Sequence, residues 1–136
     1  MPNGFYGSQE QWQRLEQAFL EWEEIFDRFA RAKTVQVIRN AHGWPSRSLE
    51  WIHQSIQRKI EVVANDVPSE TFNVWTYAWK DVGDKRFSKV TSVGTNLSKA
   101  TLAKRLTDIL DEAWAQVNAW SDNDLSSVTD IKLPNR

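Results

Sequence analysis

The chain has 136 residues, of which 40% are hydrophobic and 26% are charged, as in an ordinary globular domain that is neither disordered nor fibrous. It contains no cysteine, which excludes disulfides, thiolate metal sites and cysteine nucleophiles and fits a reducing, cytoplasmic location. The N-terminal residues show no signal-peptide pattern and no apolar run approaches the ~18 residues of a membrane span, so we expect no membrane association.

The net charge of −1 is unevenly distributed along the chain. Residues 1–30 carry a net charge of −4, residues 31–105 carry +7, and residues 106–136 carry −4 again. A basic middle segment is compatible with binding a polyanion such as a nucleic acid. The alternative is internal, because basic strand residues can balance two acidic flanking helices.

The first predicted element is a helix from Ser8 to about Ala32. Its apolar residues recur at alternating spacings of three and four, which places them on one helical face: Trp12, Leu15, Phe19, Trp22, Phe26 and Phe29. Ser8 is a suitable N-cap, and Arg28 and Arg31 lie where the helix dipole favours cations.

After this helix the hydrophobic period changes from 3.6 to 2, which predicts strands. The predicted strands span residues 34–39, 52–63, 71–80 and 85–93. The second alternates clearly, and its predicted core side consists of Ile52, Ile56, Ile60 and Val62. Residues 81–84 predict a tight hairpin turn, and the longest connection is a loop from Asn40 to about Glu50.

A second helix is predicted from about Ser98 to Trp120, with Ser98 or Asn96 as its cap. The predicted fold is therefore α+β, with two layers in the order helix, four-stranded mostly antiparallel sheet, helix, and with both helices on one face. Residues 1–120 are expected to form a single domain, and residues 121–136 a polar, partly disordered C-terminal tail.

The third predicted strand, FNVWTYAWK, leaves its orientation open. Its odd positions carry the aromatic side chains Trp75, Tyr77 and Trp79, and its even positions include Phe72, Val74 and Ala78. These two sets point to opposite faces. The free energy of burying large aromatics, on the order of 2–3 kcal/mol each, favours turning Trp75, Tyr77 and Trp79 inward. The core side of the predicted helices is already rich in Trp and Phe, which favours turning the three aromatics of this strand outward.

An outward aromatic row would mark an interaction surface. Three occupants are considered: a second copy or another protein, a small ligand held in a groove closed by the 40–50 loop, and stacked bases of single-stranded nucleic acid. The segment KRFSKVTSV lacks the glycine–aromatic signature of RNA-recognition sheets, so the sequence disfavours nucleic acid.

The 40–50 loop supplies the remaining candidates. Trp44, next to a proline, is expected to pin the loop to the domain, and Arg39, His42 and Arg47 are positioned to receive a small anionic ligand. The enzymatic alternative is a hydrolase or transferase that acts on an anionic substrate through His42, Arg47 and His53. It requires these three side chains to converge on one substrate position.

No metal-binding pattern, phosphate-binding glycine loop or dinucleotide fingerprint occurs, so neither a metal nor a cofactor is expected. The sequence therefore favours a non-enzymatic binding module. Its expected surface comprises Trp75, Tyr77 and Trp79 together with Arg39, His42, Trp44 and Arg47 of the adjoining loop.

Overall fold

The computed structural model describes residues 7–65 and 69–127. It confirms the α+β class, but with three α-helices and six strands rather than two and four. The helices are α1 (Gln9–Glu21), α2 (Glu23–Lys33) and α3 (Lys99–Asn118), with the short 3-10 helices η1 (Ala41–Gly43) and η2 (Asp122–Asp124). The strands are β1 (Gln36–Arg39), β2 (Ser46–His53), β3 (Ile56–Ala64), β4 (Phe72–Val82), β5 (Lys85–Leu97) and β6 (Ser126–Ser127).

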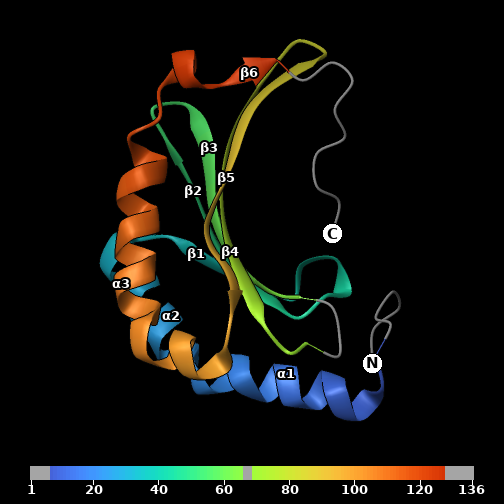
Figure 1. Ribbon diagram of the computed structural model, residues 1–136. Coiled ribbons are helices and arrows are strands. Elements are labelled where there is room, and N and C mark those ends of the chain that lie inside the picture. The colour runs from blue at the N-terminus through green and yellow to red at the C-terminus, as the bar shows by residue number, and fades with distance from the viewer. Residues whose placement is uncertain (1–6, 66–68, 128–136) are drawn as a thin grey trace.

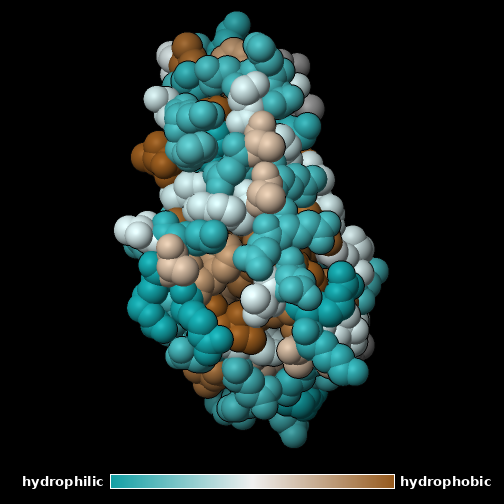
Figure 2. Space-filling view, turned by 90° about the vertical axis from the view of Figure 1, so that its left-hand side faces the viewer, coloured by the Kyte–Doolittle hydropathy of each residue, from teal (hydrophilic) through white to brown (hydrophobic). Residues whose placement is uncertain are grey.

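The six strands form one antiparallel meander in chain order, β1-β2-β3-β4-β5-β6. The three α-helices lie on one side of the sheet, and the strands bend toward the other side at both ends (Figure 1). Viewed from the helical side, the surface is mostly hydrophilic, and hydrophobic atoms are visible mainly in a hollow of the lower half (Figure 2). In the part of the chain that the structure describes, the other sheet face carries no α-helix.

The prediction of one continuous helix over residues 8–32 is wrong at Trp22. The backbone stays in the right-handed region there but departs from ideal helix values, with φ −94° and ψ −1°, and divides the segment into α1 and α2. The Trp22 side chain is buried and packs edge-to-face on Phe19 and Phe72, with ring centroids 5.5 and 5.1 Å away. The apolar stripe continues across the break, because Phe26, Phe29 and Ala30 of α2 are buried in the same core as the apolar residues of α1.

The prediction of a single strand over residues 52–63 is also wrong, because a two-residue turn interrupts it. Gln54 and Ser55 both have positive φ, 54° and 64°, and join His53 of β2 to Ile56 of β3. Glycine and asparagine are the usual signals for such a turn, and neither is present. As a result Ile52, predicted to be buried, is 65% exposed beyond the core.

Two other segments are more regular than expected. Residues 46–50, assigned to the long loop, begin β2, which pairs with both β1 and β3. Residues 121–127, assigned to the tail, form η2 and β6, and Leu125 between them is buried. Residues 128–136 of the predicted tail lie outside the described residues.

One buried cluster joins the three helices to the sheet. Its sheet side includes Ile56, Ile60 and Val62, as the alternation of the second predicted strand indicated. Ser98 caps α3 by accepting a hydrogen bond from the Thr101 backbone N–H. At the other end of α3, Arg58 of β3 is fully buried and donates to the carbonyl oxygens of Val117 and Trp120.

Candidate functional site

The structure decides which face of β4 belongs to the core. Phe72, Val74, Thr76 and Ala78 are all at most 1% exposed and face the helices. The alternate positions Trp75, Tyr77 and Trp79 are partly exposed, so the aromatic row lies on the face away from the three α-helices. The helical layer already fills the core with Phe19, Trp22 and other aromatics, which leaves room under β4 for its smaller side chains.

Strand register determines the neighbours of the aromatic row. Each aromatic residue of β4 lies directly between one residue of β3 and one of β5. Trp75 lies between Glu61 and Ser92, Tyr77 between Lys59 and Val90, and Trp79 between Gln57 and Ser88. We call these nine residues the aromatic face.

The charges on and beside the aromatic face are paired within the chain. Lys59 Nζ lies 3.5 Å from Glu61 Oε2 and 5.3 Å from the centre of the Tyr77 ring. Arg86, at the hairpin end, donates to both carboxylate oxygens of Asp81 at 2.7 and 3.0 Å and covers Trp79 at 5.8 Å. The hydrogen bond from Arg86 lowers the pKa of Asp81, and the same bond raises the pKa of Arg86. The face therefore carries little unbalanced charge.

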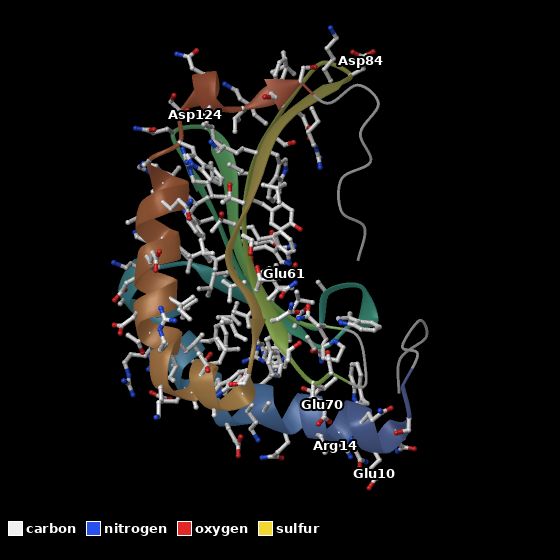
Figure 3. The ribbon with its side chains drawn as sticks, viewed as in Figure 1. Glu10, Arg14, Glu61, Glu70, Asp84 and Asp124 are labelled. Carbon is white, nitrogen blue, oxygen red and sulfur yellow. The ribbon has the colours of Figure 1, made fainter. Side chains whose placement is uncertain are left out.

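Two polar residues are fully buried in the middle of this side of the sheet. Glu61 is 1% exposed and lies on the side away from α3 (Figure 3). Its cross-strand neighbour on β2 is Ser48, which is 0% exposed and whose hydroxyl has no hydrogen-bond partner among the described residues. A buried hydroxyl left without a partner costs on the order of 1–3 kcal/mol, so this row is less stable than an apolar one would be.

The chain between β1 and β2 borders the aromatic face, on the side of the sheet opposite the helices (Figure 1). Trp44 fastens it, as expected, by donating from its indole nitrogen to the Ala64 carbonyl oxygen at 2.6 Å. Asn40, in a left-handed conformation with φ 51°, exchanges backbone and side-chain hydrogen bonds with Ser46. Ser46 also accepts from the Ala41 backbone N–H at 3.1 Å, which closes the turn.

The two arginines of the predicted anion site are held on the opposite, helical side. Arg47 is 1% exposed and pairs with Glu16 of α1 at 3.3 Å and Glu23 of α2 at 3.2 Å. Arg39 pairs with Glu23 and Asp27. Carboxylates of the chain itself therefore occupy both guanidinium groups, and the structure does not bring them to the aromatic face.

The residues of the enzymatic alternative are not brought together either. Arg47 and His53 lie six positions apart on β2, which is on the order of 20 Å along an extended strand. Arg47 is buried, whereas His53 is exposed at the end of β2. Of His42 only the backbone is described, in η1. No single substrate position lies within hydrogen-bond reach of both Arg47 and His53.

The structure also accounts for much of the positive charge of the middle segment. Several of its cations pair with carboxylates of the acidic flanks: Arg31 with Glu24, Arg39 with Glu23, Arg47 with Glu16, Lys80 with Asp122 and Lys99 with Glu21. This pairing is the internal balance that the sequence left open, and it removes the main support for a nucleic-acid surface.

A concavity of about 400 Å³ lies between α1 and the beginning of β4. Arg14 crosses its rim from α1 to Glu70, with Nε 2.6 Å from Oε1 (Figure 3). This bond raises the pKa of Arg14. The floor residues Leu15 and Phe72 are already at most 2% exposed, so an apolar ligand would gain little by covering them.

Sequence reasoning identified the aromatic row but missed the polar partners Lys59, Glu61 and Ser48. The alternation of residues 57–61 did place Lys59 and Glu61 on the side away from the isoleucines, which is the signal that connects them to the row. Ser48 falls in the predicted 40–50 loop, so the strand alternation does not connect it to the row.

Among the described residues there is no group of three or more histidine, aspartate and glutamate side chains that could hold a metal ion. None of the helices in that part of the chain is long and apolar enough to cross a membrane. No family model matches the sequence, and no match was found among curated proteins or among solved structures.

Proposed function

We propose that this protein is a non-enzymatic binding module whose working surface is the aromatic face. The observation that supports the proposal is the orientation of β4, which turns its three largest side chains away from the helical layer. Burying a large aromatic side chain contributes roughly 2–3 kcal/mol, and a partly exposed one realises only part of this. A row of such side chains along one strand is typical of a surface that a partner covers.

The surroundings of the row support binding over catalysis. Lys59 and Glu61, the ionisable side chains nearest to Trp75 and Tyr77 in the register, pair with each other. Neither His53 nor Arg47 lies on this face next to the row. We keep the cytoplasm as the expected location, since a chain without cysteine gains nothing from an oxidising compartment.

The test compares the double variant Trp75→Ala/Trp79→Ala with Phe72→Ala, a control on the helical face of the same strand. The free energy of unfolding is measured by urea titration. We expect Phe72→Ala to lose about 3–5 kcal/mol, because it empties a buried site. The double variant is expected to lose only about 1 kcal/mol of unfolding free energy per site, since surface substitutions cost little. It is also expected to lose binding to its partner. A loss as large as that of Phe72→Ala at each tryptophan would assign the row to the core and end the proposal.

A further inference from the structure

We infer that the outer edge of β1 is a separate binding surface, which takes an extended segment of a partner protein as an added strand antiparallel to β1. The sheet ends at β1, because β2 pairs with one side of this strand and no other described strand pairs with the other side. Strand addition to a sheet edge is a common mode of peptide recognition, in which backbone hydrogen bonds supply the affinity. β1 contributes no residue to the aromatic face, so the inference goes beyond the proposed function.

The hydrogen bonds around β1 show which backbone groups point to the open edge. The backbone N–H of Asn40 donates to the Ser46 carbonyl oxygen at 2.9 Å, so these two residues form a hydrogen-bonded pair. Hydrogen-bonded and non-hydrogen-bonded pairs alternate along an antiparallel ladder. Ile38 therefore directs its backbone groups to β2, whereas Val37 and Arg39 direct their N–H and C=O groups to the open edge. Each of these two residues can exchange two hydrogen bonds with an added strand.

An open concavity of about 560 Å³ borders this edge. It is lined by Asp27, Ala30 and Arg31 of α2 and by Thr34, Val35 and Gln36, which lead into β1. The positions 27, 30, 31 and 34 share one side of the helix, because they recur at helical spacing. No residue of β2 lines the concavity, so it lies on the open side of β1 with α2 as its wall. The Val35 N–H donates to the Ala30 carbonyl oxygen at 3.0 Å and holds β1 against the last turn of α2.

The floor of the concavity determines one side chain of the added segment. Val37 faces the core on the helical side, and a residue paired with it directs its own side chain to that same side. There the side chain meets Ala30 and Val35, which form an apolar floor. A small apolar side chain such as valine therefore fits opposite Val37.

Arg31 determines a second side chain of the segment. In an antiparallel strand, the residue two positions after the one opposite Val37 lies opposite Val35, which lines the concavity together with Arg31. Arg31 and Arg28 share one carboxylate, that of Glu24, at 3.4 and 3.7 Å, so the two cations outnumber their partner. The uncompensated positive charge favours an acidic side chain at this position. The segment is therefore an extended peptide with the order apolar, any residue, acidic.

The opposite edge of the sheet is less suited to strand addition. β6 already pairs with Phe87 and Ser88 of β5. Farther along, the register between β4 and β5 shifts on both sides of Val74. β5 also carries Lys85 and Lys89. Bulges and lysines are devices by which natural sheets prevent edge pairing. β1, by contrast, pairs with β2 in an uninterrupted register.

The probe is the peptide acetyl-STTTVTES-amide, whose valine is designed to lie opposite Val37 and whose glutamate then lies opposite Val35. Only about four backbone bonds form, so we expect a Kd on the order of 0.1–1 mM. The readout is amide hydrogen exchange by NMR. In the free chain, the amides of Val37 and Arg39 should exchange about tenfold faster or more than that of Ile38, which is bonded to β2. Near-saturating peptide should slow the first two several-fold and leave Ile38 unchanged.

Two N-methylated peptides form a matched pair of controls. Methylation of the valine nitrogen removes the N–H that would donate to the Val37 carbonyl oxygen, so binding should weaken about tenfold or more. Methylation of the following threonine nitrogen, which points away from β1, should change the Kd by no more than about twofold. Equal losses from the two methylations would show that the peptide does not bind as an added strand and would overturn the inference.

The charge argument has its own pair of variants. Arg31→Gln should weaken binding of the peptide about two- to fivefold, the range for an exposed ion pair. Arg28→Gln, on the same helix and with the same partner Glu24 but outside the concavity, should leave the Kd unchanged. Equal effects of the two variants would contradict the placement of the acidic side chain beside Arg31.

Two further results would overturn the inference. One is unchanged exchange of the Val37 and Arg39 amides at the highest soluble peptide concentration. The other is slowing of both amides when only the concentration of the protein is raised, which would assign the edge to a second copy of this chain. The proposed function is tested separately, because the variant Trp75→Ala/Trp79→Ala should bind this peptide as wild type does.

Discussion

Arg58 offers a direct test of how the sheet holds the end of α3. It is 0% exposed on the helical face of β3. Its guanidinium donates to the carbonyl oxygens of Val117, of Trp120 at 3.0 Å and, through two nitrogens at 3.2 and 3.1 Å, of His53. The last carbonyls of a helix have no partner within the helix, and the cation also lies at the negative end of the helix dipole. Burial lowers the pKa of Arg58, as expected for a cation removed from water.

The variant Arg58→Met keeps an apolar chain of similar length and removes the four donated bonds. Each buried carbonyl left without a donor costs about 1–3 kcal/mol, and three carbonyls are affected. The desolvation cost of the cation, which disappears with it, offsets part of this loss. We therefore expect a net loss of about 3–5 kcal/mol, with Arg58→Lys intermediate because an ammonium lacks the planar fork.

The assay is urea unfolding followed by tryptophan fluorescence, for which the chain has eight tryptophans. The matched control is Arg105→Met on the exposed side of α3, which should change the free energy of unfolding by no more than about 0.5 kcal/mol. If Arg58→Met were as stable as wild type or more stable, the carbonyl contacts would not hold α3. That result would show that the core prefers an apolar side chain to the arginine at position 58.

Three further predictions use the same unfolding assay. Arg47→Met removes one side of a buried ion pair and should lower the free energy of unfolding by about 3–5 kcal/mol. Arg39→Met removes one side of a half-exposed pair and should lower it by no more than about 1 kcal/mol, so equal losses would contradict the prediction. The hydrogen bond from the backbone N–H of Ser121 lowers the pKa of Asp124. The stability that Asp124 contributes is therefore present above its unfolded pKa of about 3.9 and is lost as the pH falls through the lower folded value. Asp124→Asn should remove this pH dependence. Gly83→Ala should destabilise the hairpin more than Gly83→Asn, because φ is +63° there.

The sequence determined much of the local structure by itself. The 3.6-residue period predicted α3 from Ser98 to Trp120, and the helix occupies Lys99–Asn118 with Ser98 as its cap. The alternation in β4 separated its side chains into the two sets that the structure places on opposite faces. These features depend on residues close together in the chain, which periodicity and capping chemistry report directly.

Local patterns failed where the turn or break had no sequence signal. Gln54 and Ser55 adopt positive φ without glycine or asparagine, so the sequence predicts one strand over residues 52–63 where the end of β2 and the whole of β3 are separate. The helical stripe of the sequence does not distinguish Trp22 from its neighbours. The helix nevertheless divides at Trp22, where the side chain contacts Phe19 and Phe72. At Trp22 the break coincides with a contact to Phe72 of β4, and at Gln54–Ser55 the pairing of His53 with Ile56 closes a turn whose positive φ these two residues do not prefer on their own.

Only the tertiary structure decided which face of β4 is the core. Both faces are apolar enough to be buried, and the aromatic one would contribute more per residue. The helical layer settles the question because its Phe19 and Trp22 already occupy the space beneath the sheet, and Phe72, Val74 and Ala78 fill what remains. This competition for one limited volume places Trp75, Tyr77 and Trp79 on the other side. It involves segments far apart in the chain, so no single stretch of sequence could predict it.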